Sequence, residues 1–491
     1  MIFLFLFFFV VFNLSSFTVS PEIKRYIYRY LIFLIIILRF YPVIFMLSPM
    51  QENASKAKAA SVLLANVSTQ AKDSALEAMA AALEENKRAI FDANQKDLDA
   101  ALEMIEKNEM SAALYDRLKL SDAKFKDMIS GIRDVAKLED PVGKTISTLL
   151  LDDGLTLYQI SSPIGVIGVI FEARPDVVPQ VMSLCLKSGN ATIFKGGSEA
   201  KNSNRALFDI LLKAMTTVPE IPADAFHLAE SREDVAEMLK SDQYIDLLIP
   251  RGSNEFVKYI QDNTRISVLG HTSGICHAYV SETADLPIAY KVCLDSKIQY
   301  PAACNAIETL LVNEKIAEAF LPEMFQIFQE NGVELRLDEK SAKIAEKTGA
   351  PFKKATQADW DAEYNDLIIA VKIVSSVNEA VNHINKHGSH HTDVILSTNQ
   401  NEIDLFVGLV DSASVMINAS SRFADGFRYG KGAEVGISTN KIHSRGPVGM
   451  EGLMIYKYIL SGSGHVVKEY TGENAKAYKH EKLQEKYCRL Q

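Results

Sequence analysis

The pattern of apolar and polar residues divides the chain near residue 50. Residues 1–12 contain no polar side chain, and a second apolar stretch runs from about 26 to 47, interrupted by Arg29 and Arg39. That stretch is long enough to span a bilayer, although Arg39 would then lie deep in it at a cost of roughly 2.5 to 3.5 kcal/mol. Met46 and Met50 both stand just before a polar, Ala-rich segment, so either is a candidate for the working start. Residues 1–49 are therefore a membrane anchor, a cleaved leader or the product of a misplaced start codon.

Beyond residue 50 the first pattern is helical. Residues 53–136 carry apolar positions at i, i+3, i+4 and i+7, as in the Ala-rich run 76–83, which is typical of amphipathic helices. The segment Asp140-Pro141-Val142-Gly143 would end this region. Residues 155–160 then alternate between apolar and polar positions, which predicts a half-buried strand.

The next region alternates between short apolar runs and helical patterns. Residues 164–171 read IGVIGVIF, as expected of a strand that is covered on both faces. Strands are predicted at 164–171, 191–195, 225–229 and 245–249, and helices at 177–187, 200–215, 233–240 and 254–261. This alternation predicts a doubly wound parallel sheet, which binds ligands beyond the carboxyl ends of its strands.

A second series of the same kind runs from about residue 275 to 445. Its strands are predicted at 277–280, 309–312, 368–374, 393–397 and 414–418. One more alternating strand is predicted at 453–460, and the charged residues from Lys468 onward are predicted to be helical.

Composition narrows the class of protein. The net charge of −10 argues against nucleic-acid binding, which requires a basic surface. Five cysteines in 491 residues favour a reduced, intracellular compartment. The expected location is the cytoplasm, with a membrane-anchored form as the alternative if residues 1–49 are part of the mature protein.

Two segments carry candidate binding chemistry. Lys195-Gly196-Gly197-Ser198 places a cation, two glycines and a helix cap where a strand ends and a helix begins. The ribose or phosphate of a cofactor would bind there, although no GxGxxG motif follows a strand. The glycine-rich run 430–436 is either an anion cradle or an ordinary loop.

Cys304 differs from the other cysteines. It lies in the small-residue loop YPAACNA at 300–306, where Asn305 can donate hydrogen bonds. A nucleophilic cysteine needs exposure and a lowered pKa, so Cys304 is either catalytic or a plain loop residue. Cys185, Cys276 and Cys293 have apolar neighbours, and Cys488 lies in the charged tail. The spacing of His383 and His387 lacks a third ligand, so no metal site is expected.

Several long blocks carry a resemblance to a known family. They are SPIGVIGVIFEARP at 162–175, LKSGNATIFKGGSEA at 186–200, IPRGSNEFVKYI at 249–260, LGHTSGICHAYV at 269–280, YPAACNAIETLLV at 300–312, HTDVILS at 391–397 and NASSRFADGFRYGKGAEVGISTNKIHSRGPVG at 418–449. Over about residues 50–470 the chain resembles the γ-glutamyl phosphate reductases of the aldehyde dehydrogenase superfamily, in their stand-alone form without a fused kinase domain.

The resemblance implies an α/β fold with two doubly wound α/β domains and a small β element for oligomerisation. A cofactor domain would span 50–274, including a hairpin near 155–163, and a catalytic domain would span 275–445. Residues 446–491 would supply a strand and a tail that join subunits into a homo-oligomer.

The resemblance also implies the chemistry. NADPH would reduce glutamyl 5-phosphate to glutamate 5-semialdehyde in proline synthesis, which suggests a functional link to glutamate 5-kinase. Cys304 would be the nucleophile, with its backbone N–H in the oxyanion hole and Asn305 beside it. Lys195, Gly197, Ser198, Ser253 and Glu363 would bind NADP(H).

Two departures from the oxidising aldehyde dehydrogenases affect the expected reaction. Val268 stands where those enzymes have a general-base glutamate, and Arg174 stands near the position of their oxyanion asparagine. Arg174 and Arg422 are predicted to bind the phosphate or carboxylate of the substrate, with an ion pair to Asp425 or Glu434 as the alternative role of Arg422. The competing functions are an aldehyde dehydrogenase that makes a free acid and a membrane-tethered scaffold without activity.

Overall fold

The structure is a computed structural model that describes residues 47–488 apart from 232 and 433. The chain divides between Pro49 and Met50, and the fold below is that of the unit beginning at Met50. In the part of the chain that is described, no helix has the length and apolar character to cross a bilayer. The stretch at 26–47 lies outside this part, except for Leu47.

The N-terminal part of this unit is helical, as the sequence predicts. Its helices are α3 (Pro49–Leu64), α4 (Thr69–Glu85), α5 (Lys87–Glu106), α6 (Ala112–Leu118) and α7 (Asp122–Lys137). Serine caps start several of them; Ser68 accepts a hydrogen bond from the Ala71 amide, and Ser121 accepts one from Lys124. The apolar face of α7 buries Phe125, Ile129 and Ile132, and such a face fixes each helix against the sheet that follows.

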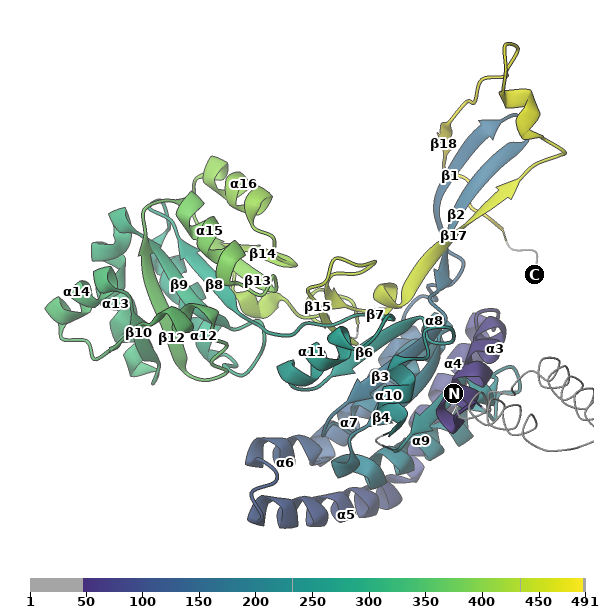
Figure 1. Cartoon of the computed structure of the whole chain (residues 1–491), viewed down its shortest axis with the longest axis horizontal. Helices are drawn as coiled ribbons and strands as arrows, with labels where there is room; N and C mark the ends of the chain where they lie inside the picture. Colours follow the sequence, from purple (N-terminus) through teal and green to yellow (C-terminus); the bar gives the residue numbers. More distant parts are fainter. Residues whose placement is uncertain (1–46, 232, 433, 489–491) are drawn as a thin grey trace, which may run out of the picture. The chain divides into compact units, whose positions relative to one another are not determined.

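The first parallel sheet has the strand order β5-β4-β3-β6-β7 (Figure 1). Its strands are β3 (Val166–Phe171), β4 (Ala191–Gly196), β5 (Phe226–Ala229), β6 (Leu247–Arg251) and β7 (Ser267–Val268), and its helices are α8 (Val177–Ser188), α9 (Lys201–Met215), α10 (Glu233–Leu239) and α11 (Asn254–Asp262). The order places β3 and β6 side by side in the centre, with β4 next to β3. The carboxyl ends of these three strands therefore meet at one edge.

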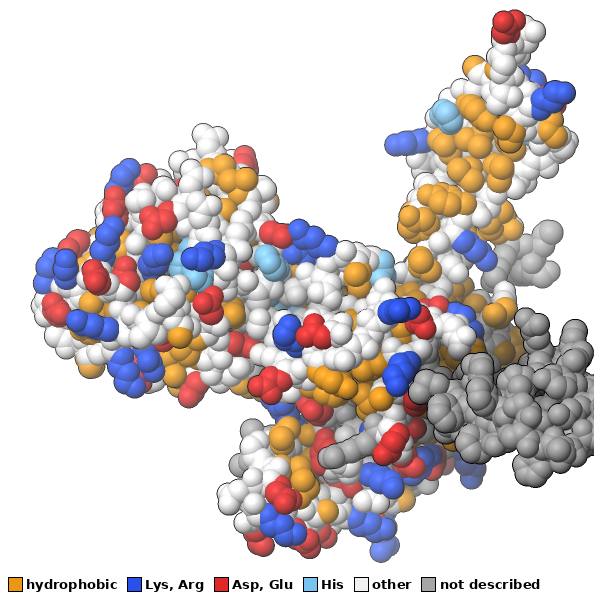
Figure 2. All heavy atoms as spheres, in the orientation of Figure 1, with side chains coloured by type: hydrophobic (Ala, Val, Ile, Leu, Met, Phe, Trp, Pro, Cys, Tyr) orange, Lys and Arg blue, Asp and Glu red, His pale blue; other side chains and the backbone are white. Residues whose placement is uncertain are grey.

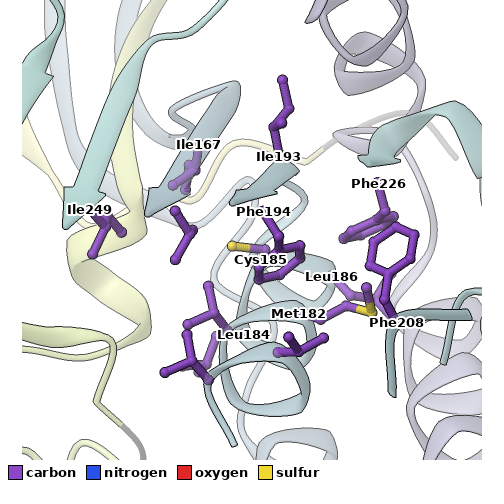
Figure 3. Close-up of a cluster of buried hydrophobic side chains, with 14 of the residues drawn as sticks. Ile167, Met182, Leu184, Cys185, Leu186, Ile193, Phe194, Phe208, Phe226 and Ile249 are labelled. Atoms are coloured by element: carbon purple, nitrogen blue, oxygen red, sulfur yellow. The ribbon is translucent and has the colours of Figure 1, made fainter. Parts of the chain in front are cut away.

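The core of this sheet is apolar on both faces. Every residue of β3 is buried, which confirms the prediction from its continuous apolar run. Figure 3 shows Phe194 of β4 beside Cys185 of α8, and Phe208 of α9 beside Phe226 of β5. Cys185 is fully buried, and burial raises the pKa of its thiol to about 12, as expected of an inert core cysteine.

The second parallel sheet has seven strands in the order β11-β10-β12-β9-β8-β13-β14. They are β8 (Cys276–Val280), β9 (Ile307–Asn313), β10 (Glu334–Leu337), β11 (Lys353–Lys354), β12 (Ile368–Val374), β13 (Thr392–Leu396) and β14 (Ser414–Ile417). The helices are α12 (Leu286–Ile298), α13 (Glu314–Glu330), α14 (Glu339–Thr348), α15 (Val377–His387) and α16 (Gln400–Leu409). Two doubly wound parallel sheets confirm the predicted fold class.

A separate antiparallel sheet has the order β17-β2-β1-β18 (Figure 1). Its strands are β1 (Thr145–Asp152), β2 (Leu155–Pro163), β17 (Met454–Ser461) and β18 (Glu481–Leu483). A two-stranded sheet, β15 (Gly436–Ser438) with β16 (Gly446–Val448), precedes β17. The domain boundaries given above remain predictions.

The predicted C-terminal helix is wrong. From Lys468 the chain makes only a short 3₁₀ turn, η6 (Val467–Tyr470), and then supplies β18. The Lys479 amide donates to the Leu151 carbonyl at 2.8 Å, and the rings of Tyr470 and Tyr478 stack with centroids 4.6 Å apart. The tail satisfies its backbone groups on the edge of β1, so the charge pattern that suggested a helix is that of a solvated surface segment.

Candidate active site

Cys304 lies in the turn that joins α12 to β9, at the edge of the seven-stranded sheet. Its side chain is half-buried. A Cβ added to Gly274 would collide with the backbone Cα and carbonyl oxygen of Cys304, so glycine lets the segment before β8 lie directly against the loop. The Cys276 thiol donates to the Cys304 carbonyl at 3.2 Å. The loop is therefore held in place by residues of β8 and the segment before it.

Two side chains tie the Cys304 loop to the segment after β14. The amide of Asn305 donates to the Ala424 carbonyl at 2.8 Å, and Nε of Arg422 donates to Gln299 Oε1 at 2.8 Å. The Arg422 guanidinium lies 5.8 Å from the centre of the Tyr300 ring. Asn305 is thus engaged in positioning the loop, and the catalytic role assigned to it stays a prediction.

The environment of Cys304 disfavours its thiolate. Burial raises the pKa of its thiol to about 12, and the carboxylates of Glu363 and Glu434 act in the same direction. Arg251 and Arg422 oppose this rise. The lowered pKa expected of a nucleophile is therefore not found for Cys304, so a proton acceptor is required before its thiol can attack.

Two histidines lie beside the thiol. One ring nitrogen each of His271 and His391, together with Cys304 Sγ, lie within 4.8 Å of one another. Nδ1 of His271 is 2.9 Å from the Ile437 carbonyl and Nδ1 of His391 is 2.9 Å from Thr392 Oγ1, which leaves Nε2 of each ring for the cluster. Burial lowers the pKa of both rings, so both are neutral at physiological pH.

Arg251 and Arg422, which come from separate segments, lie near the thiol, and Arg174 lies near Arg251. Arg251 ends β6 and donates to the Val435 carbonyl; burial lowers the pKa of its guanidinium, and Arg174 lowers it further. Burial also lowers the pKa of Arg422. Among the ion pairs of the described residues none includes Arg422, and Asp425 pairs instead with Arg428 at 3.6 Å. Cations crowded together in this way favour an anionic ligand.

The predicted cofactor residues after β4 line a shallow pocket. Gly197, Ser198, Lys201 and Glu230 are among the residues that line it. A Cβ at Gly197 would collide with the Glu199 carboxylate, which accepts a hydrogen bond from the Ala173 amide at 2.6 Å. A side chain at position 197 would therefore require the Glu199 side chain to move, whereas glycine leaves the backbone here accessible to a ligand.

Lys195 is buried just inside this edge. Its side chain is at the carboxyl end of β4, and Nζ donates to the Gly196 carbonyl at 2.6 Å. The predicted ribose-binding lysine therefore lies beside the pocket, held by the backbone that shapes it.

The remaining cofactor candidates lie between this edge and Cys304. Ser253 caps α11, and its amide donates to Glu172 Oε2 at 2.9 Å. Glu363 accepts a hydrogen bond from Asn254 Nδ2 at 2.5 Å, while its charge raises the pKa of Cys304. Glu363 thus bridges the start of α11 and the nucleophile loop.

The pair His383 and His387 does not form a metal centre. Their rings are 4.6 Å apart, but His387 contacts Asp361 at 2.7 Å and His383 contacts Lys372. Within the described residues, the one group of three His, Cys, Asp or Glu side chains close enough to share an ion is that of His271, Cys304 and His391.

Sequence reasoning did not nominate His271, His391 or Arg251. Each stands in a block that carries the resemblance, and Arg251 follows directly after the buried part of a strand. A polar residue at the carboxyl end of a strand was an available signal for Arg251. No local sequence pattern marks the two histidines, because they approach Cys304 only when three separate segments of the chain pack together.

Comparison with known proteins identifies the class. The sequence model of the aldehyde dehydrogenase family matches residues 48–345, and the chain therefore belongs to this family. It is 64% identical over 433 residues to the γ-glutamyl phosphate reductase of Methanosarcina barkeri, which covers 88% of this chain and 97% of the relative. The γ-glutamyl phosphate reductase of Methanococcoides burtonii is 63% identical over 90% of this chain and 98% of its own length.

Solved structures support the same family assignment. The γ-glutamyl phosphate reductase of Thermotoga maritima superposes with a TM-score of 0.82 at 40% identity, covering 85% of this chain and all of that one. An acetylating aldehyde dehydrogenase of Geobacillus thermoglucosidasius shares the fold, with a TM-score of 0.57 at 17% identity.

Proposed function

We propose that this chain is an NADPH-dependent reductase of L-glutamyl 5-phosphate that releases phosphate and L-glutamate 5-semialdehyde, the second step of proline synthesis from glutamate. The observation that carries the proposal is the placement of Cys304 near Arg251 and Arg422 and beside the rings of His271 and His391. Relatives at 63% and 64% identity that bear the name γ-glutamyl phosphate reductase support the substrate.

In the first step, Cys304 Sγ attacks the acyl carbon of the substrate. A carbon–sulfur bond forms, the bond from that carbon to the phosphate oxygen breaks, and phosphate leaves. The thiol proton passes to Nε2 of His271, which holds a free lone pair because its Nδ1–H donates to the Ile437 carbonyl. The raised pKa of Cys304 makes such an acceptor necessary.

The arginines would bind the phosphate and carboxylate groups of the substrate. Arg174 follows β3 and Arg251 ends β6, both strands of the first sheet, and Arg422 follows β14. A phosphate and a carboxylate each suit the planar donor fork of arginine. The backbone N–H of Cys304 stabilises the oxyanion, and no side-chain donor is assigned to it.

The residues present fit a nicotinamide cofactor. Gly197 leaves the backbone open where an added Cβ would collide with Glu199, and the pocket includes Ser198 and Lys201. Lys195, Ser253 and Glu363 would hold the rest of the cofactor, which when bound supplies the hydride that reduces the thioester on Cys304. Glu230 pairs with Arg205 at 2.8 Å and also interacts with the charge of Lys201. The positive charge of Lys201 in this pocket would favour the extra phosphate of NADPH.

The alternative is an aldehyde dehydrogenase that hydrolyses the thioester to a free acid. Val268 of β7 is buried and cannot act as a base, which disfavours hydrolysis. Glu434 favours it, because burial raises the pKa of this carboxyl and its charge reaches Cys304. Such a carboxyl could activate water if it faced the thioester.

The reverse reaction separates the two functions. Purified full-length protein is given glutamate 5-semialdehyde and NADP⁺, with and without inorganic phosphate, and NADPH formation is followed. The reductase requires phosphate, since only phosphate releases the acyl group. Equal rates without phosphate would identify the hydrolysing enzyme, and the Cys304→Ser variant measures the background.

We also infer a homo-oligomer that forms through the antiparallel sheet. β17 is an edge strand, and Figure 2 shows hydrophobic side chains gathered over this sheet. Ile455, Tyr456, Tyr458 and Leu460 are 49–61% exposed, and unpaired edges with apolar side chains favour association with another chain. Leu460→Glu should shift the protein toward monomer in size-exclusion chromatography with light scattering.

A further inference from the structure

The side chains of His271, Cys304 and His391 can also act as metal ligands, in addition to their proposed part in the reaction. We propose that His271, Cys304 and His391 form a reversible binding site for a thiophilic divalent cation of the Zn²⁺ class, whose occupancy blocks the nucleophile. Binding needs only these three side chains. The inhibitory consequence rests on the proposed role of Cys304.

The first support is geometry. One ligand atom from each of the three residues lies within 4.8 Å of the other two. In a tetrahedral zinc site, with bonds of about 2.0 to 2.3 Å, ligand atoms are about 3.5 Å apart. Closing the cluster therefore takes movements of about 1 Å, which rotation of the half-buried His271 and Cys304 side chains can supply.

The second support is a polar atom without a partner. His391 is 1% exposed, and its Nε2 is buried with no hydrogen-bond partner among the described residues. A buried polar atom that lacks a partner is costly, and it is typical of a position that a ligand completes. Because this nitrogen belongs to the cluster of His271, Cys304 and His391, its lack of a partner indicates that a ligand binds within the cluster.

The third support is the way the two rings are fixed. Nδ1 of His271 contacts the Ile437 carbonyl, and Nδ1 of His391 contacts Thr392 Oγ1, each at 2.9 Å. Metal-binding histidines typically donate their second ring N–H to an oxygen in this way, which holds the ring and raises its basicity.

The ligand types select the ion. A thiolate with two imidazoles suits Zn²⁺, or Co²⁺ in its place, whereas Mg²⁺ and Ca²⁺ require oxygen ligands. On binding, the S–H bond of Cys304 breaks, a metal–sulfur bond forms, and the proton leaves to solvent. No electron is transferred. Water would fill the fourth position, and the sulfur lone pair would no longer be free to attack.

Cobalt tests the site independently of activity. Full-length protein carrying Cys488→Ser, which removes the exposed thiol of the tail, is titrated with Co²⁺. We expect the sulfur-to-cobalt charge-transfer band and the visible bands of a tetrahedral ion. The bands should vanish in Cys304→Ser, and His391→Asn should weaken binding by at least about tenfold.

The neighbouring histidine is a matched control. His390 is next to His391, but its ring contacts the Asp411 carbonyl and is 44% exposed. Its backbone φ is 60°, which asparagine tolerates, so His390→Asn should bind Co²⁺ as the parent does. Because His391 is buried, His271→Asn is measured as well, with the melting temperature of each variant as the test of folding.

The outcomes are separable. Absence of the charge-transfer band in the parent, or its persistence in folded His391→Asn and His271→Asn, would overturn the site. With the site present, Zn²⁺ should inhibit turnover, a chelator should restore it, and substrate should slow inhibition. A site that binds cobalt through Cys304 while turnover continues would instead contradict the proposed role of Cys304.

Discussion

The two parallel sheets present their functional loops in different ways. After β4, residues 196–200 are shaped by glycines and by Glu199, and the features offered to a ligand are largely backbone. Before β9, the loop 300–306 offers one reactive side chain, around which His271, His391 and Arg422 gather from distant segments. We call the loop after β4 the binding edge and the loop before β9 the reactive edge. The residues of the binding edge are adjacent in the sequence, whereas those of the reactive edge come together only in the folded protein.

The two loops also differ in electrostatics. Lys195 is already held by the Gly196 carbonyl at 2.6 Å, so the first edge is preorganised for contact. Cys304 has a thiol pKa near 12 because of burial and two carboxylates, so the second edge is inactive until a proton is removed. Binding at the first edge and chemistry at the second should therefore be separable by mutation.

The largest separation is expected from Cys304→Ser. The hydroxyl of serine loses its proton far less readily than a thiol, so turnover should fall by at least about a thousandfold. NADPH binding, measured by fluorescence titration, should stay within about twofold of the parent, since the loop after β4 is untouched. Cys488→Ser is the control, and wild-type rates in Cys304→Ser would end the covalent mechanism.

Local patterns predicted most of the fold. Buried runs such as Val166–Phe171 have few alternatives to a central strand, and the capped amphipathic helices follow from periodicity. The strands β1, β10 and β11 were not predicted, because they are set by pairing with neighbouring strands rather than by their own pattern. The helix predicted from Lys468 onward was wrong for the same reason, because β18 forms by pairing with β1 rather than from a pattern of its own.

The residues of the candidate site also differ in whether a local sequence pattern could predict them. Lys195, Gly197 and Ser198 occur in one short segment after a strand, so their placement could be predicted from the residues. Cys304 was distinguished only by its small-residue loop, and its role came from resemblance. His271 and His391 were not found, because their proximity depends on how the segments before β8 and β13 pack.

The reactivity of Cys304 toward iodoacetamide tests the electrostatic half of the comparison. With a pKa near 12, the thiolate fraction should rise about tenfold for each pH unit, or about a hundredfold between about pH 7 and about pH 9. The Cys488→Ser protein without ligands is used, and modification is located by mass spectrometry. A plateau at neutral pH would mean that the free enzyme already holds a thiolate.

Arg422→Lys probes the anion-binding part of the reactive edge. Lysine lacks the planar fork, so kcat/KM for the semialdehyde should fall about ten- to a hundredfold. The melting temperature should fall by only about 2 °C, since the one bond lost is that to Gln299. Arg133→Lys, on an exposed ion pair of α7, is the control. Unchanged kinetics with a clearly lower melting temperature would assign Arg422 to the scaffold.

Gly197→Ala tests the binding edge alone. The added Cβ would collide with the Glu199 carboxylate, and relieving this contact should raise KM for NADPH by about tenfold. Alkylation of Cys304 should be unchanged. Gly408→Ala is the matched control, because nothing lies within 4 Å of a Cβ at that position. A large loss of Cys304 reactivity in Gly197→Ala would show that the two edges are coupled.

Removal of residues 1–49 should have the smallest effect. Both edges belong to the unit that begins at Met50, and the family match begins at residue 48. Met50 itself is 2% exposed and packs in the core of the first sheet, so a chain that starts there keeps its first core contact. We expect kcat/KM within about twofold of the full-length value. Inactivity of the truncated protein, with the full-length protein active in a membrane fraction, would show that the extension is a working anchor on which the two edges depend.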